Sequence, residues 1–255
     1  MQAKNSHNTK ASQILIIFET TNYRPYSFES IIQLAARINA VIHGIYIEDQ
    51  DLLSAVELPF IREIEHHTAN VRHTDSLIMS RQLRDYAEKI KSLLQTQAGA
   101  FSVKATFSSV RGRRLSAIEQ HLNSAELILL PAHKSLSDNG HEQKKPTVKK
   151  YIAVIYDKSP ASEHCLSIAI SIAQTADVEL LILTNTREVS TSMKNQNIKY
   201  ALVTIDVNQS GQVFSMLNHY IPDLLLVPAS SQLLNQEHFL QKHINRFNYD
   251  VMIVR

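Results

Sequence analysis

One octet of the sequence occurs twice, once in each half of the chain. Residues 125–132 read AELILLPA, and residues 222–229 read PDLLLVPA. Both copies place an acid before four aliphatic residues and Pro-Ala after them. A short aliphatic run bounded in this way is typical of a strand that is buried on both faces.

Apolar runs of strand length alternate with helical patterns around both octets. The first half predicts strands at 14–18, 41–47, 101–110 and 127–130, and helices at 26–39, 76–97 and 115–122. The second half predicts strands at 152–156, 178–183, 200–207, 224–227 and 251–254, and helices at 162–175, 211–217 and 237–247. Strands separated by helices imply right-handed crossovers and a parallel sheet. The sequence therefore predicts an α/β protein made of two diverged copies of one parallel-sheet unit.

The two copies predict a division into domains. The first unit spans residues 13–133, the second spans 151–255, and the polar segment 134–150, rich in Lys and Ser, is a linker. The first unit carries a long insert, residues 48–100, between its second and third strands. It also lacks a counterpart of the last strand of the second unit.

That last strand is apolar, and an unpaired apolar edge strand promotes association. We expect it to pair antiparallel with its equivalent in a second chain, which predicts a homodimer. The alternative is that it pairs only within its own sheet and that Arg255 protects the edge. The residues of this predicted dimer strand are Val251, Met252, Ile253 and Val254.

Composition restricts the class of protein. The single cysteine, Cys165, excludes an intramolecular disulfide framework and favours a reducing compartment. The polar start of the chain and the shortness of its apolar runs predict neither a signal peptide nor a membrane helix, so we expect a cytoplasmic protein. A net charge of +2 does not require nucleic acid or a membrane as partner.

Three segments resemble the universal stress protein family in its tandem form. Residues 152–159 (IAVIYDKS) resemble its opening strand, residues 173–180 (AQTADVEL) resemble the entry to its second strand, and residues 223–227 (DLLLV) resemble its fourth strand. The resemblance covers residues 13–254. It implies two tandem adenine nucleotide alpha hydrolase-like units with parallel sheets flanked by helices, and a role in stress response.

The nucleotide-binding motif of that family is degenerate in this sequence. ATP-binding members follow the fourth strand with G-x-x-G and, further on, G-[ST], because glycines let backbone N–H groups approach a phosphate. Here Gly140 stands alone after the first octet, and no glycine follows Ala229. Glu237 and His238 lie where the family has Gly-Ser. We therefore expect neither unit to bind ATP, and no cofactor.

Several side chains are candidates for a ligand site. Asp157 and Ser159 follow a buried strand at its carboxyl end, where ligands bind in open α/β sheets, and in ATP-binding relatives the matching acid contacts the adenine side. Glu19 is the equivalent in the first unit, and Pro228 and Ala229 close the last octet. The alternative, favoured by the loss of the glycine loop, is that Asp157 and Ser159 cap the helix that follows.

Other polar clusters have simpler interpretations. Arg111, Arg113 and Arg114 lie at a strand-to-helix turn, where three guanidinium groups could hold an anion, although arginines at a turn are more often solvated. The histidine-rich segment 63–75 lacks any recognised metal-ligand spacing, so we expect no metal site. Cys165 lies on an apolar helix face and predicts a buried small hydrophobe.

The leading hypothesis is a non-catalytic universal-stress-type protein that acts through a protein partner or a small ligand. The alternative is a nucleotide-binding sensor or weak nucleotide hydrolase with a rearranged phosphate site. A third interpretation is an anion or nucleic-acid binder that uses the arginine cluster and the lysines of the linker.

Overall fold

The computed structural model describes residues 12–19, 25–58, 60–64, 71–73, 75–121, 125–132, 150–187, 193, 198–235 and 249–255. Their main feature is one large sheet. Its strands are β1 (Gln13–Phe18), β2 (Val41–Asp49), β5 (Ala105–Gly112), β6 (Leu127–Leu130), β7 (Tyr151–Tyr156), β8 (Glu179–Thr184), β9 (Tyr200–Thr204), β10 (Leu224–Pro228) and β11 (Asp250–Val254). They lie in the order β5-β2-β1-β6-β11-β10-β7-β8-β9.

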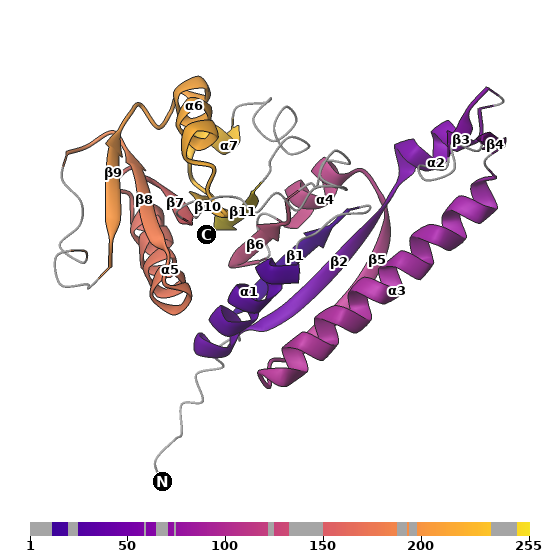
Figure 1. Ribbon diagram of the computed structural model, residues 1–255, viewed down its shortest axis with the longest axis horizontal. Helices are drawn as coiled ribbons and strands as arrows, with labels where there is room; N and C mark the ends of the chain where they lie inside the picture. The colour runs from indigo at the N-terminus through magenta and orange to yellow at the C-terminus, as the bar shows by residue number, and fades with distance from the viewer. Residues whose placement is uncertain are drawn as a thin grey trace, which may run out of the picture.

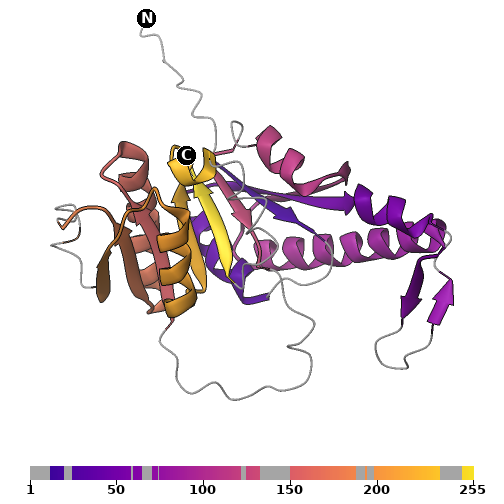
Figure 2. The same ribbon diagram turned by 90° about the horizontal axis from the view of Figure 1, so that it is seen from above.

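Helices cover both faces of this sheet (Figures 1 and 2). Helices α1 (Pro25–Arg37), α3 (Ser76–Ala100) and α5 (Pro160–Ala176) pack on one face. Helices α4 (Arg114–His121), α6 (Ser210–Tyr220) and α7 (Gln232–Asn235) pack on the other. The predicted α/β class, with a mostly parallel sheet flanked by helices, is confirmed.

The strands are buried on both faces, as their continuous aliphatic runs predict. In β1, Ile14, Ile16 and Phe18 join the core beneath α1, α3 and α5. Leu15 and Ile17 of the same strand join the core beneath α4 and its neighbours. This alternation follows from the twofold period of a strand.

Two groups of strands share one internal order. β5-β2-β1-β6 and β9-β8-β7-β10 each place the third, second, first and fourth strand of their group side by side, and all these pairings are parallel. The predicted strands and helices that fall on described residues are present, with shifts at their ends, and the helix predicted at 237–247 lies outside the described residues. β5 begins only at Ala105, because the chain first turns at Ser102, which has a φ of 57°. β9 ends at Thr204, short of the predicted Val207.

The C-terminal strand β11 corrects the sequence prediction. It pairs parallel with β10, where Met252 lies opposite Leu226, and antiparallel with β6, where Met252 lies opposite Leu129. Residues Val251, Met252, Ile253 and Val254 therefore do not form an edge strand. The prediction failed because β6, which has no fifth strand of its own group beside it, offers an edge that β11 fills. The strand pairs within its own sheet, as the alternative had it, but as an interior strand with no edge for Arg255 to protect, and the homodimer itself stays a prediction.

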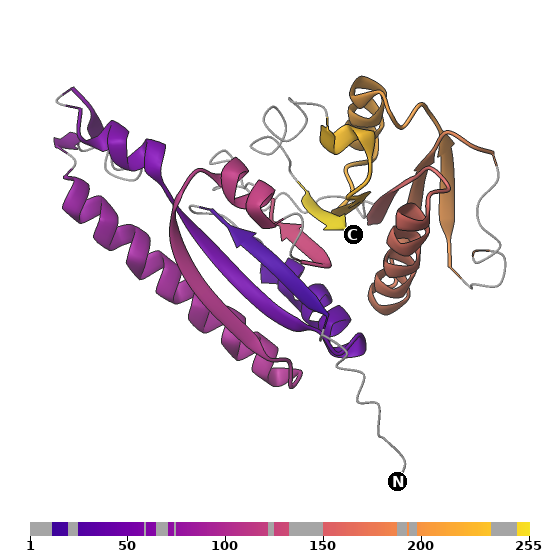
Figure 3. The ribbon, with the colours of Figure 1, turned by 180° about the vertical axis from the view of Figure 1, so that it is seen from behind.

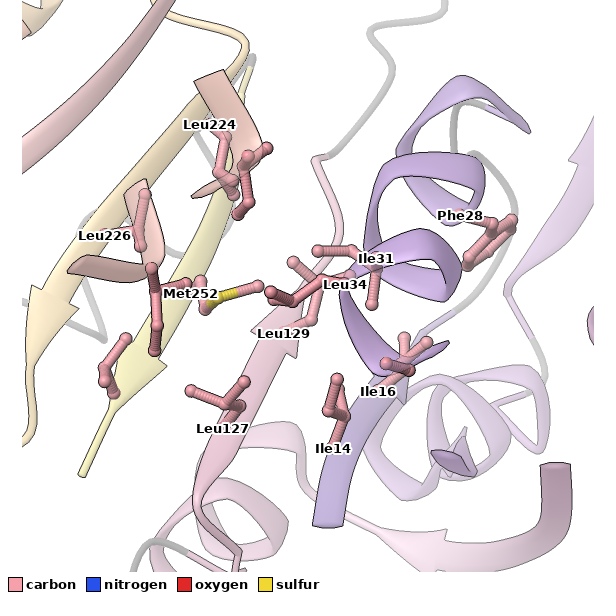
Figure 4. Packing of buried hydrophobic residues seen from close by; sticks show 14 of the residues in the cluster. Ile14, Ile16, Phe28, Ile31, Leu34, Leu127, Leu129, Leu224, Leu226 and Met252 are labelled. Atoms are coloured by element: carbon pink, nitrogen blue, oxygen red, sulfur yellow. The ribbon is translucent and has the colours of Figure 1, made fainter. Parts of the chain in front are cut away.

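Side chains from both groups of strands form one core across this junction. Figure 4 shows Met252 between Leu226 of β10 and Leu129 of β6, with Leu34 of α1 close by. Met252 has no exposed surface. The neighbouring helices are also joined, since Nη1 of Arg37 on α1 donates to the backbone oxygen of Ser171 on α5 over 3.3 Å.

The predicted insert, residues 48–100, forms an arm beside the sheet. It contains α2 (Gln50–Val56), the antiparallel hairpin of β3 (Arg62–Ile64) and β4 (Val71–His73), and α3. Figure 3 shows α2 and the hairpin at one end of α3, beyond the strands. No helix in the described ranges combines the length and apolar content that a bilayer crossing needs.

Candidate functional site

Asp157 lies directly after β7, at the carboxyl end of that strand. Its Oδ1 accepts a hydrogen bond from the backbone N–H of Ser159 over 2.9 Å. Ser159 is the N-cap of α5, and its Oγ accepts from the N–H of Ser162 over 3.2 Å. The hydroxyl of Ser162 in turn donates to the backbone oxygen of Ser159 over 2.9 Å. These bonds give Asp157 and Ser159 the capping role that the sequence allowed as an alternative.

The same bonds keep Asp157 ionised. Burial alone would raise the pKa of its carboxyl group, but hydrogen bonds from Ser159 and Ser162 outweigh burial and hold the pKa below its ordinary value. The charge is thus stabilised within the chain itself, without a ligand. The predicted ligand contact of Asp157 and Ser159 stays a prediction.

The end of β10 carries Pro228 and Ala229. The backbone N–H of Ala229 donates to the backbone oxygen of Val254 over 2.7 Å, and the N–H of Ser231 donates to that of Pro228 over 2.9 Å. Ser231 then accepts at Oγ from the N–H of Leu233 over 3.3 Å. The N–H of Ala229 is therefore bonded to β11 at the point where the family would direct such groups at a phosphate.

The end of β6 is occupied in a similar way. The backbone N–H of Ala132 donates to Oδ1 of Asp250 over 2.8 Å. The Asp250 residue is only 6% exposed, and its own N–H donates to the backbone oxygen of Asp223 over 3.1 Å. β11 thus brings a buried carboxyl group to the octet of the first group of strands. Sequence reasoning missed Asp250, although an acid directly before a buried aliphatic strand is a signal that could have found it.

At both octets, a backbone N–H group is already bonded within the chain. A phosphate needs free N–H groups and a positive local potential. In the described residues, the first N–H group after each Pro is bonded to an oxygen of the chain, and one of those oxygens belongs to a carboxyl group. Gly140, the linker up to residue 149 and the pair Glu237 and His238 lie outside the described residues.

Glu19 lies after β1 near a buried tyrosine of β2. The hydroxyl of Tyr46 has no hydrogen-bond partner among the described residues, and the side chain has no exposed surface. Burial, followed by the nearby Tyr86, Glu48 and Glu19, raises the pKa of the Tyr46 hydroxyl, so it remains protonated and can donate. The sequence prediction named Glu19 but missed Tyr46, because a tyrosine inside a buried strand gives no signal of its own.

Two arginines of the predicted anion site are paired with carboxylates. Nη2 of Arg111 lies 3.4 Å from Oε2 of Glu48, and Nη2 of Arg113 lies 3.0 Å from Oδ1 of Asp51. Arg111 lies in β5 and Arg113 directly after it, so the two pairs join the end of β5 to the end of β2 and the start of α2. The side chain of Arg114 lies outside the described residues. An anion at this turn would compete with these carboxylates, and the anion site stays a prediction.

The remaining candidates give no site. Cys165 is buried on α5, as predicted, and burial raises the pKa of its thiol, with a further contribution from Asp157. No group of three or more His, Cys, Asp or Glu that could hold a metal occurs within the described ranges. The side chains of the histidine-rich segment 63–75 lie outside them up to residue 74.

Comparisons with known proteins give structural neighbours only. No protein-family model and no curated protein matches the chain. A universal stress protein from Archaeoglobus fulgidus is 10% identical, with a TM-score of 0.48, over 95% of this chain and 96% of its own. A functionally unknown protein from Pseudomonas aeruginosa is 10% identical, with a TM-score of 0.47, over 96% and 92%. A universal stress family protein from Burkholderia pseudomallei is 11% identical, with a TM-score of 0.30, over 76% and 97%.

Proposed function

We propose that the chain is a tandem universal-stress-type protein that acts in stress response by binding a protein partner or a small ligand, without binding ATP. The segments at 152–159, 173–180 and 223–227 support the family, and the shared order of the two strand groups supports the tandem form. The single cysteine favours the cytoplasm as its location.

The hydrogen bond from Ala132 to Asp250 carries this proposal most directly. An ATP site at β6 would need that N–H for a phosphate and would place phosphate charge beside a buried carboxyl group. At the second octet the N–H of Ala229 is likewise already bonded, in this case to the uncharged backbone oxygen of Val254. In this proposal, the N–H groups that follow the two Pro residues serve to join β11 to the rest of the sheet.

Exposed apolar side chains on the insert favour a protein partner. Phe60 is 72% exposed and Leu77 is 77% exposed, and Leu58 and Ile78 are also exposed nearby in the sequence. Several large apolar side chains exposed on neighbouring segments of the insert are typical of an interaction surface. A homodimer remains part of the proposal, but it needs a surface other than β11, whose two edges are both paired.

Calorimetric titration with ATP, ADP and AMP tests the exclusion of ATP. We expect no heat of binding for any of them in the micromolar range, with the unmodified chain. The matched variant Asp250→Asn keeps an oxygen acceptor for the N–H of Ala132 and removes the negative charge. We expect this variant not to bind ATP either, because the oxygen of its side-chain amide still accepts the hydrogen bond from the N–H of Ala132. Micromolar affinity of the unmodified chain for ATP would contradict the proposal.

A further inference from the structure

Three polar side chains meet on the α4 side of the sheet, away from the carboxyl ends already described. Nδ1 of His43 on β2 lies 2.7 Å from Oγ1 of Thr106 on β5, and Nε2 of the same ring lies 3.2 Å from Oγ of Ser108. The parallel register produces this group, because His43 lies opposite Thr106 and Ile45 lies opposite Ser108. Alternate residues of β5 point to the same face, so both hydroxyl groups reach one imidazole ring.

One tautomer of His43 makes the ring a base for Ser108. With the proton on Nδ1, the ring donates to Oγ1 of Thr106, whose own hydroxyl proton can go to the backbone oxygen of Ile42, 3.4 Å away. The lone pair of Nε2 then faces the hydroxyl of Ser108. A serine hydroxyl that donates to a histidine oriented by a third group is the arrangement of an activated nucleophile.

The surroundings favour the neutral form of the histidine and leave the serine accessible from solvent. Burial, followed by the charge of His121 at the end of α4, lowers the pKa of His43 below 6.5. His121 is the titratable group that acts on the ring from α4. The ring also contacts the two hydroxyl groups, and His43 lies opposite Leu15 of β1. β5 lies at the edge of the sheet in the described part, and Ser108 is only partly buried.

We propose that Ser108 is an activated nucleophile that accepts an acyl group from activated esters, with His43 as general base and Thr106 as the residue that orients it. Oγ of Ser108 bonds to the carbonyl carbon, and its proton moves to Nε2 of His43. The bond from that carbon to the leaving oxygen then breaks, and His43 returns the proton to the leaving oxygen. The reaction ends with an acyl-serine and a neutral histidine, and the acyl group need not be released again. This reaction is separate from the proposed binding function and does not depend on it.

The neighbouring Ser109 provides a matched control. Its side chain points to the opposite face of β5, where its hydroxyl donates to Oε1 of Glu48 over 3.2 Å. It is a serine on the same strand with a hydrogen bond to a carboxylate, and no histidine contacts it among the residues described. If serines on this strand reacted with esters without help from His43, both Ser108 and Ser109 would be acylated.

The test uses p-nitrophenyl acetate with the full chain. We expect a burst of about one nitrophenolate per chain and, by peptide mass spectrometry, an acetyl group on Ser108. Ser108→Ala removes the burst, His43→Gln slows it about 100-fold, and Ser109→Ala leaves it unchanged. Thr106→Val slows it by a smaller factor, because the ring loses its orienting partner. The burst rate of the unmodified chain rises with pH through the pKa of His43 and is level by neutral pH.

Each variant is compared by its melting temperature, so that loss of the burst is separated from loss of the fold. Acetylation confined to lysines or to Ser109 would overturn the proposal. So would a burst rate that is the same in folded His43→Gln as in the unmodified chain.

Discussion

Met252→Asp lowers the free energy of unfolding by about 4 kcal/mol or more. Met252 lies in the middle of β11, between Leu226 and Leu129 (Figure 4), and has no exposed surface. A carboxylate there would be buried among aliphatic side chains from both groups of strands. We expect a large loss of melting temperature and of the denaturant midpoint.

Leu77→Asp is the control for this change. It introduces the same side chain at an exposed position of α3, where we expect a change within about 0.5 kcal/mol. A Met252→Asp protein as stable as Leu77→Asp would show that β11 does not lie inside the sheet. Met252→Leu, of similar volume, should cost less than about 1.5 kcal/mol and shows that the effect comes from charge.

Gly44→Ala lowers the free energy of unfolding by about 1–3 kcal/mol. A Cβ at Gly44 would lie 2.7 Å from Cδ2 of Phe107, 2.9 Å from Cδ2 of Leu94 and 3.1 Å from Cε2 of Phe18. Two of these distances are shorter than carbon atoms tolerate, so α3 or the aromatic rings would have to move. Thermal or denaturant unfolding measures the loss.

Gly99→Ala should change stability in the opposite direction. Gly99 lies in the last turns of α3, and nothing lies within 4 Å of a Cβ built there. Alanine should stabilise the protein by about 0.5–1 kcal/mol because it restricts the unfolded chain and favours the helix. If Gly44→Ala also stabilised the protein, this result would contradict the close packing of Leu94 and Phe107 against Gly44.

Local patterns were enough to predict most of the elements. The run at residues 127–130 predicted β6 to the residue, because four aliphatic residues between an acid and a proline leave little choice. The stripe of Leu83, Ala87, Ile90 and Leu94 predicted α3, and all four are buried in the structure. In these segments the hydrophobic period and the tertiary packing demand the same conformation.

The place of β11 could not be predicted from such patterns. Residues 251–254 are an aliphatic run that suits an edge or an interior strand equally. What decides between them is the edge that β6 offers, more than a hundred residues earlier in the chain. The contact between Asp250 and Ala132 depends on that pairing, and so it was missed. The histidine and serine of β2 and β5 meet only through the register of two strands that are separated by the insert.

Amide hydrogen exchange in β11 tests the central claim that this strand lies between β10 and β6. The N–H of Asp250 is directed at Asp223, on the β10 side, and the N–H of Arg255 is directed at Glu126, on the β6 side. Successive N–H groups of a strand alternate between its two edges. The structure therefore predicts slow exchange at every residue from 251 to 255. Fast exchange at Val251, Ile253 and Arg255, with protection only at Met252 and Val254, would show that β11 is an edge strand and would contradict the account.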